Sequence, residues 1–187
     1  MDDLFADGLP TLDTPRLRLR HPRLSDADAL FSVFSNADAL RYWSHGPLVN
    51  IDAARAYLTD MEVGFQEERS FRWAIAEQET DQLIGTVTLL AWSKDNRRAE
   101  IGFVLHPAYH GRGLATEAIR TVLAFGFGPM DLHRVEADVD PANEGSLRLL
   151  ERIGFQREGL LRQRWFTFGT WKDTVLLGLL AEDFASS

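Results

Sequence analysis

The 187-residue sequence contains no cysteine, and this excludes disulfides, thiolate metal sites and a cysteine nucleophile. It also lacks a long apolar run, because the longest, residues 175–181, is far shorter than the ~20 residues of a membrane span. The first residues, Met1 to Asp3, include acidic side chains where a secretory signal has basic ones. We therefore expect a soluble, cytoplasmic protein with no membrane partner.

Positive charge is scarce as well, since 28 acidic residues against 20 basic ones give a formal net charge of −8. Proteins that bind nucleic-acid backbones usually have the opposite balance, so we expect no nucleic-acid partner. The densest basic stretch, residues 16–23, alternates arginine with leucine, which favours an edge strand with one solvated face. An acidic surface instead favours cationic partners.

Metal ligands are equally sparse. His106 and His110 have the four-residue spacing of a helical ligand pair, but Pro107 and Gly111 prevent a helix there, and no His-Glu-x-x-His motif occurs. Ser146 lacks the Gly-x-Ser-x-Gly surroundings of a hydrolase nucleophile. We therefore expect neither a metal nor a hydrolase triad.

The length fits one domain, and 45% hydrophobic with 26% charged residues is ordinary for a globular protein. We expect this domain at residues 10–184, after a flexible tail at residues 1–9. Periodicity predicts strands at residues 17–19, 71–75, 83–92, 98–106, 132–139, 160–168 and 171–180. Helices are expected to begin at Ser25, Asn50, Gly113 and Asn143. The order β-α-α-β-β-β-α-β-α-β-β implies parallel pairing inside a mixed sheet.

The most informative segment is the strand at residues 100–105 and the turn that follows it, HPAYHGRGLATEA at residues 106–118. Small residues at 111, 113 and 115 let backbone N–H groups approach a ligand, and the helix N-terminus adds its positive dipole end. The turn can therefore hold a pyrophosphate, although it lacks the Gly-Lys-Ser/Thr ending of a Walker loop and the third glycine of a dinucleotide fingerprint. A purely structural strand-to-helix turn would use glycines too.

Three short motifs together resemble the GNAT superfamily of acetyl-CoA-dependent N-acetyltransferases. HGRGLA at residues 110–115 is similar to the Gln/Arg-x-x-Gly-x-Gly/Ala signature of that family, with His110 where Gln or Arg is usual. Asn143, Ser146 and Gly154-Phe155 are similar to its Asn-x-x-Ser and Gly-Phe pattern. TPRLRLR at residues 14–20 and GTWKD at residues 169–173 resemble the RimJ/RimL-like branch, which includes acetyltransferases of ribosomal-protein N-termini.

This resemblance implies a single α/β (α+β) domain. Its mixed, bent sheet of about seven strands would split in a V between the strand that ends near Leu105 and the strand near Val139, flanked by about four helices. Acetyl-CoA would lie in the split, with its pantetheine on the first strand and its pyrophosphate on the amides of residues 111–116. The implied cofactor-binding residues are Phe103, Val104, Leu105, His110, Gly111, Arg112, Gly113, Leu114, Ala115, Thr116 and Asn143.

Acetyl transfer to an amine needs an uncharged nitrogen. At pH 7, neutralising a lysine-like amine of pKa ~10.4 costs about 4.6 kcal/mol, against about 1 kcal/mol for an α-amine. Glu100 shares a strand face with Gly102 and Val104, where a mid-strand glycine indicates a bulge or a close ligand. Glu100 is therefore the candidate base, with pairing to Arg97 or Arg98 as the structural alternative.

Ser146 matches the position in this branch thought to protonate or hydrogen-bond the departing sulfur. Its structural alternative is solvation of the first helical turn, three residues after an Asn143 cap. The backbone N–H of Val104 and its neighbours would polarise the thioester carbonyl, as an oxyanion hole does.

Two aromatic clusters are candidates for the acceptor pocket, because the resemblance places both segments there, although core packing also explains aromatics at such positions. Their members are Tyr42, Trp43, His45, Trp165 and Trp171. We expect an amine acceptor such as a basic peptide or protein N-terminus. A small amine (an antibiotic or a polyamine) and a non-catalytic acyl-CoA sensor stay open, as do a monomer and a homodimer.

Overall fold

The computed structural model describes residues 3–185. Its strands are β1 (Leu12–Asp13), β2 (Leu17–Arg20), β3 (Ser70–Glu77), β4 (Leu83–Ser93), β5 (Arg98–Leu105), β6 (Arg134–Val139), β7 (Gln156–Thr167) and β8 (Thr170–Leu180). Its helices are α1 (Ala27–Phe34), α2 (Ile51–Gln66), α3 (Leu114–Phe127), α4 (Glu144–Ile153) and α5 (Ala181–Ala185). Short 3₁₀ turns are η1 (Asp3–Phe5), η2 (Leu24–Asp26) and η3 (Pro107–Tyr109).

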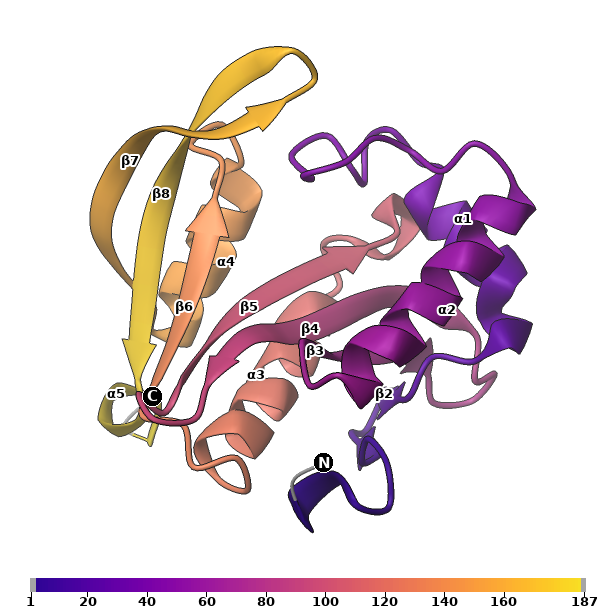
Figure 1. Cartoon of the computed structure of the whole chain (residues 1–187), viewed down its shortest axis with the longest axis horizontal. Coiled ribbons are helices and arrows are strands. Elements are labelled where there is room, and N and C mark those ends of the chain that lie inside the picture. The colour runs from indigo at the N-terminus through magenta and orange to yellow at the C-terminus, as the bar shows by residue number, and fades with distance from the viewer. Residues whose placement is uncertain (1–2, 186–187) are drawn as a thin grey trace.

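All eight strands form one sheet in the order β1-β2-β3-β4-β5-β6-β8-β7. Among the strands of residues 3–185, only β5 and β6 pair in parallel, and their pairing covers just Arg98–Glu100 against Arg134–Glu136. Beyond these residues the two strands diverge, so the sheet opens into the predicted V (Figure 1). The predicted fold class is confirmed, with β1 and α5 as short additions.

Helices cover both faces of the sheet, and each face has its own core. On one face, α1 and α2 pack against Ala74, Leu83 and Val104. On the other face, apolar side chains of α3 and α4 pack against β2 to β6 and β8. Figure 1 shows α1 and α2 on the opposite side of the sheet from α3. The core on the α3 and α4 face therefore spans both sides of the split. Within residues 3–185, no helix has both the length and the apolar composition needed to cross a bilayer.

Three of the four predicted helix starts are confirmed. Asn50 accepts the amide of Ala53 at 2.8 Å, Asn143 accepts the amide of Ser146 at 3.2 Å, and α3 begins directly after Gly113. The prediction of Ser25 as a cap is wrong, because Ser25 lies inside η2 and Asp26 stands at the α1 N-terminus.

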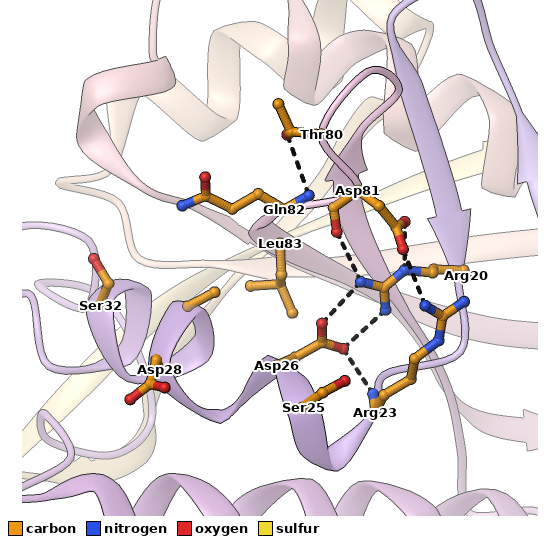
Figure 2. Close-up of a pocket in the computed structure, with 11 residues that line it drawn as sticks. Arg20, Arg23, Ser25, Asp26, Asp28, Ser32, Thr80, Asp81, Gln82 and Leu83 are labelled. Atoms are coloured by element: carbon orange, nitrogen blue, oxygen red, sulfur yellow. Dashed lines mark hydrogen bonds and ion pairs between the residues drawn. The ribbon is translucent and has the colours of Figure 1, made fainter.

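The N-cap of α1 is Asp26 instead of Ser25 because Asp26 binds a buried cation, Arg20. Arg20 is 2% exposed, and its guanidinium donates to Asp26 at 2.8 Å and to Asp81 at 2.8 Å (Figure 2). The Asp26 carboxylate also accepts the amide of Arg23 at 2.7 Å. Since a buried charge is costly without a partner, this network determines where the helix begins. Residues 17–20 also lie second in the sheet rather than at its edge, because β1 pairs with β2.

The N-terminal segment is docked, in contrast to the flexible tail expected at residues 1–9. Phe5 is fully buried and stacks on Phe71 with ring centroids 4.4 Å apart, and Leu9 is buried too. Edge contacts from Phe65 and Trp92 complete the aromatic cluster around Phe5. The few apolar residues of this short segment show no helix or strand period, so sequence patterning missed these contacts. Residues 1 and 2 lie outside the described part of the chain.

Candidate active site

The split in the sheet holds a cavity of about 790 Å³. It is lined by β5, the turn into α3, the end of β6, the start of α4 and part of the segment between α1 and α2. All the predicted cofactor-binding residues except Arg112 line this cavity. A smaller depression around Arg20 shares no residue with it, and four of its five charged side chains, Arg20, Arg23, Asp26 and Asp81, already pair with one another (Figure 2). The cavity in the split is therefore the candidate site.

The turn into α3 presents unused amide groups. Gly111 and Gly113 adopt left-handed φ values of +73° and +76°, which favour glycine. Within residues 3–185, no protein group accepts a hydrogen bond from the backbone amides of residues 111–116, and the first helical bond runs from Glu117 to Gly113 at 3.1 Å. A Cβ at Gly111 would meet nothing within 4 Å. The amides and the helix dipole thus fit a pyrophosphate.

Arg16 braces this turn from outside the cavity. Its guanidinium donates to the Arg112 carbonyl at 2.8 Å and to Glu117 at 2.7 Å. Burial opposes ionisation of Glu117, but hydrogen bonds from Thr14 and Arg16 outweigh it and hold the pKa of this carboxyl below its usual range. The Arg16 guanidinium also lies beside Gly113, 3.5 Å from where a Cβ would stand. The Arg16 contacts therefore fix the turn, while Glu117 balances the Arg16 charge.

His110 and Arg112 hold the turn in other ways. The ring Nε2 of His110 lies 2.9 Å from the Leu105 carbonyl oxygen, which can only accept, so Nε2 donates. This bond ties the turn to the end of β5. The Arg112 guanidinium lies over the Tyr109 ring, 5.4 Å from its centroid. The Arg112 side chain does not line the cavity, whereas His110 does.

The open side of β5 supplies a second set of backbone groups. Residues Ile101 to Leu105 pair with β4 on one side but have no β6 partner on the other. Backbone N–H and C=O groups along such an interrupted edge can pair with an extended ligand. Phe103, Val104 and Leu105, the predicted pantetheine contacts, lie along this edge and line the cavity.

Glu100 lies where the split begins, in the last parallel pair, opposite Glu136. Burial, followed by the charges of Asp138 and Glu136, raises the pKa of Glu100 to about 6, against weaker opposing effects of Arg164 and Arg98. The alternative partners are engaged elsewhere, since Arg97 binds Asp131 and Arg98 binds Glu136. Within the described residues Glu100 accepts no hydrogen bond, as expected of a carboxylate that is free to take a proton.

Gly102 explains how a ligand can reach Glu100. Glu100 itself does not line the cavity, but Gly102, the next residue on the same strand face, does. Gly102 pairs directly with Thr88, so the alternative of a bulge is wrong, and a Cβ there would meet only Leu90, at 3.9 Å. The missing side chain leaves space between the cavity and the carboxylate.

Ser146 lines the cavity in the first turn of α4. Its amide bonds to Asn143, and its hydroxyl has no hydrogen-bond partner among residues 3–185. Asn143 caps the helix, as the sequence predicted, and it also lines the cavity. The hydroxyl is therefore available to a ligand.

The aromatic candidates divide between the cavity and other places. Tyr42 and Trp43 line it, whereas His45 accepts the Trp43 indole N–H at 2.9 Å and packs against Phe34. Trp165 and Trp171 lie on the β7–β8 hairpin, 44% and 60% exposed, and do not line the cavity.

Asp138 is a cavity residue that the motifs did not single out. Along β6, Val135, Ala137 and Val139 point into the core, whereas Asp138 lies on the opposite face and lines the cavity. The only available signal was strand alternation next to the Glu100 strand. Among the described residues, no three His, Asp or Glu side chains come together as metal ligands.

Comparisons with known proteins agree with this geometry. The family described as "Acetyltransferase (GNAT) domain" matches residues 16–156. The chain is 40% identical over 171 residues to the uncharacterized N-acetyltransferase YoaA of Bacillus subtilis, covering 91% of this chain and 97% of that protein. It is 27% identical over 169 residues to spermidine N(1)-acetyltransferase of Escherichia coli, covering 90% and 88%.

A solved structure extends the likeness to the fold. The acetyltransferase (GNAT family) from Bacillus anthracis superposes with a TM-score of 0.82 at 26% identity, covering 92% of this chain and 99% of that one. The RimJ/RimL-like branch stays a prediction. By its matched family and its relatives, the chain belongs to the GNAT family and is an acetyl-CoA-dependent N-acetyltransferase.

Proposed function

We propose that the chain acetylates a cationic primary amine by direct attack, with Glu100 as the base. The amine nitrogen attacks the thioester carbonyl, a C–N bond forms, the C–S bond breaks and the CoA sulfur leaves with the electron pair. Before the attack the ammonium gives one proton to Glu100, directly or through water, and the second proton that the nitrogen loses after the attack goes to the departing CoA sulfur. The observation that carries this proposal is the unpaired Glu100 carboxyl at the start of the split, with its pKa raised to about 6.

A pKa of about 6 suits a base in two respects: the ionised fraction at pH 7 and the free energy of proton transfer from the amine. At pH 7 about nine-tenths of such a carboxyl is ionised and ready to accept a proton. Each pKa unit between donor and acceptor costs 1.36 kcal/mol, so an α-amine near 7.8 loses its proton to Glu100 for about 2.4 kcal/mol. A lysine-like amine near 10.4 needs about 6 kcal/mol. The site therefore favours an α-amine.

The cosubstrate would be held by backbone groups. In this proposal the amides of residues 111–116 bind the pyrophosphate, the open edge of β5 binds the pantetheine, and an amide near Val104 polarises the carbonyl. The unpartnered Ser146 hydroxyl would donate to the departing sulfur. Acetyl-CoA supplies the activated acetyl group.

We infer that the first candidate acceptor is the N-terminal α-amine of a basic peptide, because of the proton-transfer cost and the net charge of −8. A polyamine is the second candidate, and a specific observation favours it: a relative at 27% identity is named as a spermidine N(1)-acetyltransferase. Tyr42 and Trp43 are the proposed aromatic contacts of either acceptor. His45, Trp165 and Trp171 stay predictions for that role.

Acetyl transfer across an amine panel tests the proposal. The panel comprises a basic peptide with a free N-terminus, the same peptide with a blocked N-terminus and exposed lysines, and spermidine. CoA release gives the rate, and mass spectrometry locates the acetyl group. We expect the free N-terminus to be modified fastest, with a rate that falls as salt rises to ~0.5 M. Modification of lysines alone, or turnover with neutral amines alone, would refute the acceptor.

A further inference from the structure

Asp138 lies on β6 across the split from β5. Glu100 and Glu136 form the last residue pair between β5 and β6. Asp138 follows Glu136 by two residues, so it lies closer to the open end of the split and on the same face of the sheet as Glu100. It also lines the cavity. Its position is therefore next to the proposed base, on the opposite wall.

One oxygen of Asp138 has no hydrogen-bond partner. Its Oδ2 is fully buried, and within residues 3–185 no group donates to it. The facing cation is Arg164 of β7, whose Nε lies 3.8 Å away, too far for a hydrogen bond. The Arg164 guanidinium is half-exposed and lies over the Trp165 ring. A buried carboxylate oxygen without a donor is costly, so this position calls for a donor from outside the chain.

The charges around Asp138 favour a cationic donor. Glu136 is already neutralised by Arg98 at 2.7 Å and Arg134 at 2.9 Å. Glu100 has no such partner, and within the described residues Asp138 has only the long ion pair with Arg164, at 3.8 Å. The wall of the split thus has an excess of negative charge near the proposed base. An ammonium group, compact and carrying three donors, matches it.

We propose that Asp138 binds the ammonium form of the acceptor amine and thereby selects acceptors that are protonated in solution. The inference rests on the proposed function and names the acceptor-binding residue. The ammonium donates one N–H to Asp138 Oδ2 and passes a different proton to Glu100, after which the neutral nitrogen attacks. Asp138 keeps its charge throughout and takes no proton.

Asp138→Asn tests the assignment, because it keeps the shape and removes the charge. A hydrogen bond to a charged group is worth ~1.5–3 kcal/mol, so we expect KM for a cationic amine to rise about 30-fold with kcat within about threefold. KM for an alkoxyamine, which is neutral at pH 7, should change less than about twofold. Glu144→Gln is the matched control, since Glu144 is exposed, pairs with Arg148 and does not line the cavity.

A binding measurement separates this inference from the proposed function, because it needs no turnover. With the protein saturated by CoA, calorimetry follows the binding of spermidine and of the free-N-terminus peptide. We expect the affinity of at least one of them to fall about 30-fold in Asp138→Asn, with CoA affinity unchanged. Equal affinity in wild type and variant would overturn the inference, even if acetyl transfer occurs. So would the same KM change for cationic and neutral acceptors.

The variant is expected to fold, since it keeps the side-chain shape and loses only a 3.8 Å ion pair with the half-exposed Arg164, and its thermal midpoint should stay close to that of wild type. Should Asp138→Asn fail to fold, Asp138→Ala gives the same comparison, because it leaves no acceptor at Oδ2. If Asp138→Ala still selects cationic over neutral amines as wild type does, the inference is overturned as well.

Discussion

Replacing Glu100 by Gln should make the protein more stable, a result that a merely structural ion pair would not give. Burial and the neighbouring acidic charges raise the pKa of this carboxyl from 4.5 to about 6, so ionised Glu100 is disfavoured in the folded state. At 1.36 kcal/mol per pKa unit, the difference corresponds to about 2 kcal/mol. Partial exposure of the side chain screens this to about 1–2 kcal/mol.

The sign of the effect depends on pH. Below pH 4.5 Glu100 is protonated in both the folded and unfolded states, and Glu100→Gln should leave the free energy of unfolding unchanged. Between pH 4.5 and about 6 the unfolded state releases its proton first, so wild type loses stability as pH rises through this window. Above about pH 6 the penalty is complete, and the variant should be the more stable protein by about 1–2 kcal/mol.

Urea unfolding of both proteins at intervals from pH 4 to pH 8 measures this difference. Glu144→Gln is the matched control, since Glu144 is exposed and pairs with Arg148, one turn away on α4. We expect it to change stability by less than about 0.5 kcal/mol at every pH. A Glu100→Gln protein that is less stable than wild type at pH 8 would refute the reasoning, because it would mean that ionised Glu100 is compensated by a partner.

Three further substitutions test other parts of the account. At 100 times its dissociation constant acetyl-CoA should stabilise the protein by about 2.7 kcal/mol, and Gly113→Asp should abolish this shift in thermal unfolding, because it places a negative side chain at a left-handed position beside the amides. A normal shift would place the pyrophosphate elsewhere. Ser146→Ala should lower kcat less than Glu100→Gln, since water can protonate a thiolate of pKa ~8.5; an equal loss would make Ser146 essential. Phe5→Ala should cost about 3–5 kcal/mol in urea unfolding, and a loss under ~1 kcal/mol would contradict the docking of residues 3–9.

Local patterns predicted most of the fold, because each depends on residues close in sequence. Alternating apolar residues marked β3, β4 and β5, and the side chains of Asn50 and Asn143 cap the helices that follow them. The strand, glycine turn and helix at residues 100–118 belong to the same class of signal. They predicted the turn whose residues line the cavity, whereas the place where the sheet splits was implied by the family resemblance.

The features that sequence missed all depend on contacts between distant segments. Phe5 is buried because β3 and α2 bring Phe71 and Phe65 to it, and neither is near it in sequence. The α1 start moves to Asp26 because buried Arg20 requires a carboxylate. Asp138 lies near Glu100 only because β6 pairs with β5, so no local motif could identify it.

The pH dependence of acetyl transfer tests the central claim, that Glu100 takes the proton of the acceptor amine, most directly. We expect kcat/KM for a free-N-terminus peptide to rise with pH through an apparent pKa of about 6 in wild type. Glu100→Gln should lose this limb and run ~10²–10⁴-fold slower at pH 7, with acetyl-CoA affinity unchanged. The same limb near pH 6 in both proteins, or near-normal turnover in the variant, would contradict the claim.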